Sequence, residues 1–185
     1  MHMVELRWVE HDSPLGKLTL LGGHKGLVRI DFPDWITPKE RADWARRWVA
    51  ESVVLRRDLN AHKVWRKLLD RYFAGRIETF DKGGIDMKGT DFQKSVWRLL
   101  LDIPYGQTRT YGELAQELGK PGAAQAVGGA NHDNPLPIVV PCHRVIGSRG
   151  ELVGYAGGLR AKRWLLNVEG SMQQPQLFDP VLPVR

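Results

Sequence analysis

The residue pair with the clearest chemical potential in this sequence is Cys142-His143. Cys142 is the only cysteine among 185 residues, and His143 follows it directly. A cysteine acts as a nucleophile near neutral pH when its pKa is lowered or when a neighbouring base takes its proton. The base needs an orienting group in turn, and Glu169 is the candidate for that role. The three residues predict nucleophilic chemistry at sulfur, with a proton relayed through His143 to Glu169.

The geometry of this pair depends on the chain around it. Adjacent side chains point to opposite faces of a β-strand, so Cys142 and His143 can cooperate only at a turn or a helix start. A buried strand is predicted at 138–140, and Pro141 cannot continue its ladder, so the turn is expected at Cys142. Taken alone, the dipeptide fits an inert thiol beside a loop histidine better, because a free cysteine is usually core packing.

The composition limits the partners that this chain can have. A single cysteine rules out an intramolecular disulfide and disfavours a multi-cysteine zinc site, so we expect no metal and no cofactor. A net charge of +6 and a pI of about 9.6 favour a polyanionic partner. The sequence has no apolar run that could span a bilayer and no signal peptide pattern. We therefore expect a cytoplasmic protein without membrane contact.

The first half of the chain is predicted to form a small antiparallel sheet with helices. Short apolar or alternating runs at 4–9, 17–21 and 27–32 are separated by turn-forming residues. Helices are predicted at 35–51 and 59–74, and the apolar face of the second includes Val64 and Tyr72. Glycine-containing segments follow, and we place the end of this N-terminal domain, residues 1–88, among them.

Residues 89–170 are predicted to form a mainly helical C-terminal domain. Thr90 caps a helix that Pro104 ends, and Thr110 caps a short helix at 111–118. A turn and a second short helix at 123–131 complete a helix-turn-helix pattern. A last helix is predicted at 159–168, and residues 171–185 are predicted to be a flexible tail. The expected fold class is therefore α/β in the α+β sense.

The sequence around Cys142 resembles the signature of the O6-alkylguanine-DNA alkyltransferases. The resemblance rests first on NPLPIVVPCHRVIG at 134–147, and then on GYAGGL at 154–159 and KRWLL at 162–166. It continues upstream in IPYG at 103–106, TYG at 110–112 and AVGGA at 126–130. These segments cover residues 90–170 almost without a break, whereas the N-terminal part matches in layout only.

This resemblance implies that Cys142 takes an alkyl group from O6 of guanine, or from O4 of thymine. The product is a thioether, which has no good leaving group, so each molecule is expected to act once. Besides Cys142, His143 and Glu169, the family gives catalytic roles to Tyr111, as proton donor to guanine, and to Asn134, which orients the site. The carbonyl groups of Cys142 and Val145 are expected to accept from the guanine amino group. The expected substrate pocket consists of Pro137, Val145, Tyr155, Ala156 and Gly157.

The resemblance also implies a double-stranded DNA partner that carries alkylated guanine. A base inside a duplex cannot reach a buried thiol, so the nucleotide must be flipped out. The small residues of the second short helix suit the minor groove, although a helix buried by small-residue packing is an alternative. Gln125 stands where the family has an intercalating arginine, and it cannot stack as a guanidinium does, so we expect weaker flipping. The predicted DNA contacts are Ala124, Gln125, Ala126, Gly128 and Arg144, with Lys162 and Arg163 as further candidates for phosphate contact.

Three other interpretations stay open at this point: a lesion-binding protein without transfer activity, a cysteine hydrolase, and a helix-turn-helix regulator that dimerises on the major groove. Cys142 argues against the first, while Gln125 leaves room for weak activity. Residues 174–178 resemble the short peptides with which bacterial repair proteins bind the sliding clamp, but a disordered tail is the preferred interpretation. We expect the chain to act as a monomer.

Overall fold

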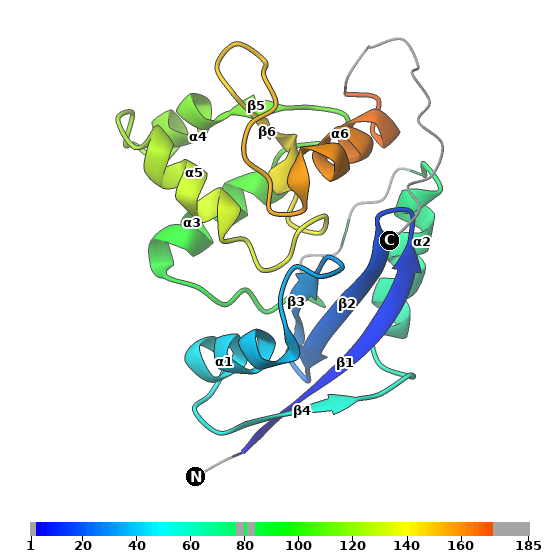
Figure 1. The fold of residues 1–185 in the computed structure, drawn as a ribbon. Coiled ribbons are helices and arrows are strands. Elements are labelled where there is room, and N and C mark those ends of the chain that lie inside the picture. The colour runs from blue at the N-terminus through cyan, green and yellow to red at the C-terminus, as the bar shows by residue number, and fades with distance from the viewer. Residues whose placement is uncertain (1–2, 77–79, 81–83, 172–185) are drawn as a thin grey trace.

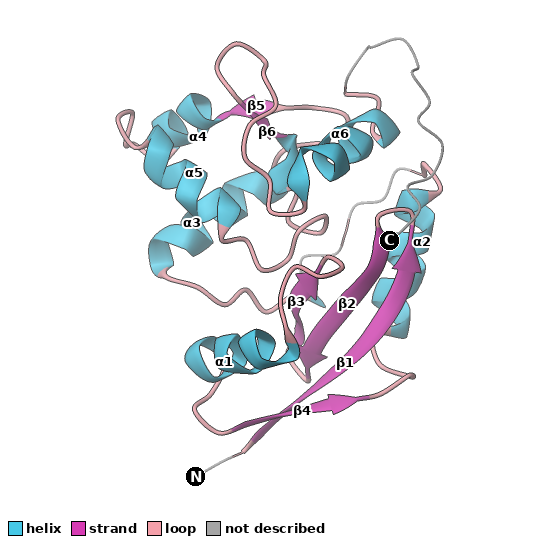
Figure 2. Cartoon of the chain, in the orientation of Figure 1, coloured by secondary structure: helices cyan, strands magenta, loops and turns pink. Residues whose placement is uncertain are grey.

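A computed structural model describes residues 3–76, 80 and 84–171 of the chain (Figure 1). The predicted tail, apart from its first residue, and its clamp-like segment at 174–178 lie outside the described residues. The first half of the described chain forms a sheet with two helices, and the second half is mainly helical (Figure 2). The predicted α+β fold class is confirmed.

The sheet contains the three predicted strands and a fourth that was not predicted. β1 (Val4–Ser13), β2 (Gly16–Gly23) and β3 (Gly26–Asp31) pair in antiparallel fashion. β4 (Val53–Arg57) then lies parallel to β1, which gives the order β3-β2-β1-β4. The sheet is therefore mixed, because the chain crosses back through α1 (Pro38–Trp48) before β4 begins.

Two helices accompany this sheet. α1 begins after Thr37, whose side chain accepts from the backbone N–H of Glu40 while the Glu40 carboxylate accepts from the Thr37 N–H. α2 (Lys63–Phe73) buries Trp65, Leu69 and Tyr72, as its periodicity predicts. Val64, which was assigned to the same apolar face, is 70% exposed, so that part of the prediction is wrong.

The second half of the described chain contains four α-helices, a short 3-10 helix and one short pair of strands. α3 begins after Thr90 and α4 after Thr110, and both threonines form capping boxes, so the predicted helix starts are confirmed. β5 and β6 pair in parallel next to Cys142. The bounds of these elements are α3 Asp91–Leu101, β5 Arg109–Thr110, α4 Tyr111–Glu117, α5 Ala124–His132, β6 Val145–Ile146 and α6 Gly158–Val168.

The predicted strand at 138–140 is wrong. Pro137 and Val140 form an isolated bridge, and Val140 N–H donates to the Leu136 carbonyl at 2.8 Å, which describes a turn. Ile138 has a φ of 75°, a left-handed conformation that is unusual for a β-branched residue. The apolar run is buried because this turn lies inside the protein, next to Cys142.

The two halves share one hydrophobic core. Its buried members come from the sheet, from α2 and from the helices of the second half, as shown by Leu20, Leu69, Trp97 and Leu165. A backbone hydrogen bond of 2.8 Å also joins Ile30 N–H to the Pro135 carbonyl. The boundary at residue 88 stays a prediction, and the core extends across it. None of the helices in the described part of the chain has the length and apolarity that a membrane crossing requires.

Candidate active site

Cys142 lies at the start of a short 3-10 helix, Cys142–Arg144, directly after Pro141. The Cys142 N–H donates to the Val140 carbonyl at 2.8 Å, and the Arg144 N–H donates to the Pro141 carbonyl at 3.0 Å. The predicted helix start at Cys142 is therefore confirmed. The thiol is enclosed, with only 2% of the residue exposed. A substrate atom can reach it only by entering the protein interior.

The surroundings of Cys142 act on its ionisation in two directions. Burial raises the pKa of the thiol to about 11, because a thiolate is poorly solvated in the interior. The Asn134 side chain, the charge of Lys162 and the backbone N–H groups of Cys142 and His143 lower the pKa and would stabilise a thiolate once formed. The thiol is therefore protonated at neutral pH, and reaction requires a base that removes its proton.

His143 has the properties of that base. Its side chain is completely buried, and Nε2 lies 2.8 Å from Glu169 Oε1. Burial lowers the pKa of His143 despite the opposing effect of Glu169, so the ring is neutral near pH 7. A carboxylate only accepts, so Nε2 carries the proton and Nδ1 has the free lone pair. Nδ1 has no hydrogen-bond partner among the described residues, and it can receive a proton from Cys142 directly or through a water molecule.

Glu169 is held as an anion at the end of α6. It accepts from Tyr72 Oη at 2.6 Å, His143 Nε2 at 2.8 Å, two Arg144 nitrogens at 2.8 and 2.9 Å, and the Gly106 N–H at 3.3 Å. Burial would raise the pKa of Glu169, but hydrogen bonds and charge from His143 and Arg144 outweigh it and lower the pKa to about 2. The low pKa opposes the predicted proton transfer onto Glu169, which instead orients His143.

Arg144 requires a correction, because its side chain is buried in the protein interior. The guanidinium is buried against the Glu169 carboxylate in a two-pronged ion pair, and Nη1 donates to the Ile103 carbonyl at 2.6 Å. Its charge is needed inside the protein to balance Glu169. The predicted contact between Arg144 and DNA is therefore wrong. Arg144 instead holds the Glu169 carboxylate that accepts from His143.

Lys162 is also buried, although the sequence suggested a phosphate contact. It is 0% exposed, and Nζ donates to the carbonyls of Val145 at 2.6 Å and Val153 at 2.7 Å, with Gly154 at 3.4 Å. Burial lowers the pKa of Lys162 to about 8, and the charge interaction with Cys142 opposes that change. Lys162 thus joins β6 to the loop before α6 and places a positive charge near the thiol.

We expect Lys162→Met to slow reaction at Cys142 by roughly 10-fold at pH 7, since one pKa unit corresponds to a factor of ten in thiolate concentration. Loss of the positive charge raises the pKa of Cys142, so the rise in rate with pH moves to higher pH. The measurement is the rate of Cys142 alkylation by iodoacetamide between pH 6 and 10. Lys67→Met, which changes an exposed lysine of α2, is the control and should match the unaltered protein. An unchanged pH profile in Lys162→Met contradicts this role.

Tyr111 and two asparagines surround the thiol from the side of α4 and α5. Tyr111 starts α4, and burial together with the nearby Cys142 raises the pKa of its hydroxyl, which keeps the proton that it was predicted to donate. Asn134 donates to the Val140 carbonyl at 2.8 Å and accepts from Leu136 N–H, so it fixes the turn before Cys142. Asn131 was not predicted, and its Nδ2 donates to the Cys142 carbonyl at 3.4 Å.

Of the residues predicted for the substrate pocket, Tyr155 contacts His143 directly. Tyr155 packs edge-on against His143 and Phe32, with ring centroids 6.5 and 5.8 Å apart. A Cβ at Gly157 would lie 2.8 Å from the Phe32 ring, so any larger residue there would require that ring to shift. The Val145 carbonyl, expected to accept from guanine, already accepts from Lys162. Pro137 is buried, and Ala156 is partly exposed.

The predicted DNA contacts on α5 are accessible. Gln125 and Ala126 are exposed, and Ala124 and Gly128 are partly exposed. A Cβ at Gly128 would lie 3.9 Å from the Tyr111 ring, so this surface borders the residue predicted to donate a proton. Exposed small residues next to the site do not support the alternative in which α5 is wholly buried.

Sequence reasoning missed two residues for which a signal was present. Lys162 precedes Leu165 and Leu166 by three and four positions, which places it on the buried face of α6. Tyr72 was assigned to the core, but a buried tyrosine hydroxyl usually has a hydrogen-bond partner, and here the partner is Glu169. No pattern in the sequence identifies Asn131, whose contact depends on how α5 meets the 3-10 helix.

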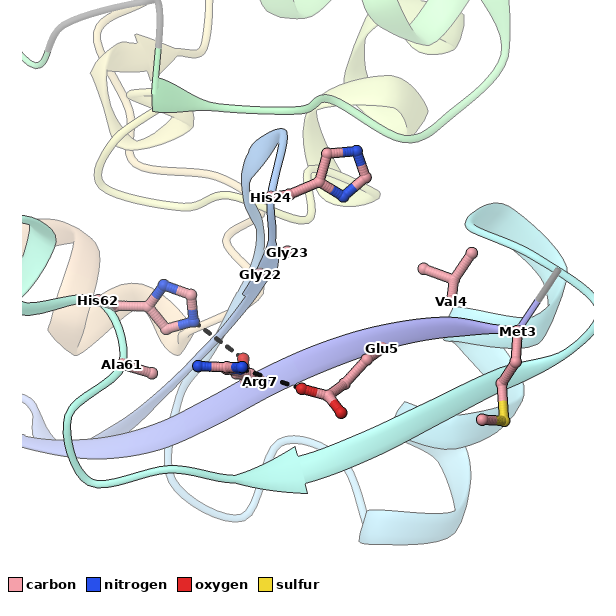
Figure 3. A pocket seen from close by; sticks show the side chains of 9 residues that line it. All are labelled: Met3, Val4, Glu5, Arg7, Gly22, Gly23, His24, Ala61 and His62. Atoms are coloured by element: carbon pink, nitrogen blue, oxygen red, sulfur yellow. Dashed lines mark hydrogen bonds and ion pairs between the residues drawn. The ribbon is translucent and has the colours of Figure 1, made fainter.

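A separate surface pocket lies in the N-terminal half and contains none of the predicted site residues. It is formed by β1, β2 and the start of α2, with Glu5, Arg7, His24 and His62 around it (Figure 3). His62 Nε2 lies 2.9 Å from the Arg7 carbonyl. Among the described residues no group of His, Cys, Asp and Glu could hold a metal ion.

A family model, curated sequences and solved structures all show similarity between this chain and methyltransferases that act on methylated DNA. Residues 91–171 match the family model "6-O-methylguanine DNA methyltransferase, DNA binding domain". The chain is 46% identical over 158 residues to a methylated-DNA–protein-cysteine methyltransferase of Methanosarcina barkeri, covering 85% of this chain and 93% of that protein. It is 46% identical over 170 residues to the protein of that name from Mycobacterium tuberculosis, covering 91% and 96%. A crystal structure of Mycobacterium tuberculosis OGT in complex with DNA superposes with a TM-score of 0.75 at 43% identity, covering 91% of this chain and 94% of that one.

Proposed function

Because the chain belongs to the methylated-DNA–protein-cysteine methyltransferase family, we propose that it repairs DNA by moving an alkyl group from O6 of guanine to Sγ of Cys142. One observation carries this proposal. The single, enclosed thiol lies beside a neutral histidine whose Nε2 is fixed by an anionic glutamate and whose Nδ1 is free to accept a proton. This arrangement produces a nucleophile only when a proton is removed inside a closed site.

The reaction follows from these contacts. His143 Nδ1 takes the thiol proton, and Asn134, Lys162 and backbone N–H groups stabilise the thiolate. Sγ attacks the alkyl carbon, the S–C bond forms and the C–O6 bond breaks. The electron pair of the broken bond stays on guanine, which takes a proton from the Tyr111 hydroxyl. Transfer leaves His143 protonated and Tyr111 as a phenolate, and both become neutral again when the proton taken from Cys142 leaves His143 and a proton returns to Tyr111 through water.

The product determines that each molecule acts once. A thioether on Cys142 has no good leaving group and no carbonyl that water could attack, so the thiol is not regenerated. We propose the same outcome for O4-alkylthymine, in which an alkyl group is again bound to an exocyclic oxygen next to a ring nitrogen. The protein is thus consumed in proportion to the lesions that it repairs.

A titration tests this proposal. Duplex oligonucleotides with one O6-methylguanine are added in increasing ratio to the protein, and the intact protein mass and the remaining lesion are measured. We expect every protein molecule to gain one methyl group and repair to stop at one lesion per protein. Tight lesion binding with no change in mass would instead identify a lesion binder, and repeated turnover would identify a hydrolase. An O4-methylthymine duplex tests the second substrate in the same way.

The enclosed thiol also requires that the damaged nucleotide leaves the helix stack. Flipping costs a few kcal/mol, which contacts with the DNA must offset. We propose that α5 enters the minor groove and that Gln125 fills the gap left by the flipped base. The exposure of Gln125 and Ala126, next to Tyr111, supports this placement.

We expect Gln125→Arg to strengthen binding to a lesion-containing duplex, because a guanidinium can stack on bases and attract phosphates. A cation–π contact of this kind is worth about 0.5–2 kcal/mol, so a gain of roughly 2- to 30-fold is expected. Binding is measured by fluorescence anisotropy with a Cys142→Ser background, which prevents reaction. Asn60→Arg adds the same charge to an exposed position of the N-terminal half and controls for general attraction. Equal gains in both variants would refute a specific role for position 125.

A further inference from the structure

The N-terminal half contributes the Tyr72 side chain to the hydrogen bonds around His143 and Glu169. Tyr72, on α2, donates its hydroxyl proton to Glu169 Oε1 at 2.6 Å, across 97 positions of sequence. The same hydroxyl lies 3.4 Å from His143 Nε2. Tyr72 is fully buried. Its hydroxyl therefore shares one carboxylate oxygen with the histidine that acts as the base.

Aromatic packing fixes the position of this hydroxyl. The Tyr72 ring packs against Phe73, Phe80 and Tyr105, with centroid distances of 5.6, 5.6 and 6.1 Å. Trp65 and Leu69 bury the same face of α2. A ring held in this way cannot turn its hydroxyl elsewhere without repacking the core. The hydrogen bond to Glu169 is thus set by the docking of α2 against the second half.

We propose that Tyr72 is a positioning residue for alkyl transfer, whose hydroxyl holds Glu169 Oε1 and limits how strongly that oxygen stabilises a protonated His143. The proposal rests on the proposed function, because His143 must be neutral to accept the thiol proton. Donation from Tyr72 withdraws negative charge from Oε1. Without it, Oε1 would favour the imidazolium form more strongly, and His143 would be charged, and inactive as a base, over a wider pH range.

Other charged and titratable groups also face His143. Glu169 at the end of α6 favours the protonated ring, whereas Arg144 on the 3-10 helix and Lys162 on α6 oppose it. Tyr155 packs against the ring from the loop before α6, and Cys142 precedes it in the chain. All of these groups remain in Tyr72→Phe, which removes one oxygen atom and keeps the ring. A change in the pH profile therefore reports the hydroxyl.

The experiment compares Tyr72→Phe, Tyr105→Phe and the unaltered protein between pH 5 and 9. Two rates are measured: methyl transfer from an O6-methylguanine duplex, and alkylation of Cys142 by iodoacetamide without DNA. Each profile has an acid limb, the pH range over which the rate falls as His143 becomes protonated. For Tyr72→Phe we expect this limb to lie at a pH higher by about half to one unit in both profiles, with roughly 3- to 10-fold slower reaction on the limb. Tyr105→Phe is the matched control, since its hydroxyl donates to the Val168 carbonyl and not to Glu169.

An acid limb at the same pH in Tyr72→Phe and the unaltered protein overturns the proposal, and so does a rate loss that is uniform across pH. If the unaltered protein takes no methyl group from the duplex, the proposed function fails, while the iodoacetamide profiles still decide the role of Tyr72. Should Tyr72→Phe not fold, 3-fluorotyrosine at position 72 keeps the hydroxyl and makes it a stronger donor. The acid limb should then move downward, and an unchanged limb again contradicts the proposal.

Discussion

Cys142→Ser is expected to abolish methyl transfer while the protein still folds and binds lesion-containing DNA. Serine differs from cysteine by one atom, and the base available to its hydroxyl is a neutral histidine. A hydroxyl is a much weaker nucleophile than a thiolate, and we expect that His143 does not activate it enough for transfer. The measurement is the intact mass of the variant after incubation with an excess of O6-methylguanine duplex, where no methylated protein should appear.

Two controls accompany the serine variant. Thermal unfolding should show a stability change of about 1 kcal/mol or less, because nearly the same volume remains buried. The affinity for the lesion duplex should stay within a few-fold of that of the unaltered protein. If Cys142→Ser still removes methyl groups from DNA at a comparable rate, Cys142 is not the acceptor and the account of the site is wrong.

Glu169→Gln is expected to have the largest combined effect on stability and rate. The change leaves Arg144 buried without its anion, and breaking a buried ion pair in this way costs about 3–5 kcal/mol of unfolding free energy. His143 also loses the group that fixes its tautomer. We expect transfer to slow by roughly 10²- to 10⁴-fold, the range that general-base catalysis contributes. Urea unfolding and single-turnover transfer measure the two effects separately.

The pH dependence of stability gives an independent check on Glu169. The pKa of its carboxyl is lowered from 4.5 to about 2 in the folded protein. The stabilisation is therefore complete above pH 4.5 and is lost as the pH falls towards 2. The difference in unfolding free energy between the unaltered protein and Glu169→Gln should shrink across that interval. Glu117→Gln, which removes an exposed partner of Arg109, should change stability by less than about 1 kcal/mol. A constant difference between pH 5 and 2 contradicts the buried anion.

The parts of the fold that could be predicted are those determined by local chemistry. Thr90 and Thr110 have the spacing of capping boxes, and both helices begin where that spacing places them. The first three strands are short apolar or alternating runs that are separated by turn-forming residues. By contrast, β4 is short, ends in two arginines and pairs in parallel with a strand about fifty positions earlier. Its existence depends on long-range pairing, which the local sequence does not reveal.

The errors around the site have a common cause, since they concern side chains whose partners are distant in sequence. Arg144 and Lys162 were assigned to the DNA surface because basic residues are usually exposed, but each neutralises or ties together groups in the interior. The turn at Ile138 was taken for a strand because apolar β-branched residues usually form one. The sequence predicted that Cys142, His143 and Glu169 form one site, and the structure places His143 and Glu169 in contact. A buried tyrosine on α2 also suggested a hydrogen-bond partner for Tyr72, but the sequence did not reveal that the partner is Glu169.

The most direct test of the central claim follows the alkyl group itself. A duplex with one O6-methylguanine that carries a deuterated methyl group is incubated with the protein, and peptides from the protein are mapped by mass spectrometry. The account predicts that the labelled methyl group is found as a thioether on Cys142 and that the DNA contains unmodified guanine. Label on another residue, label released as methanol, or label that remains on the DNA would contradict it.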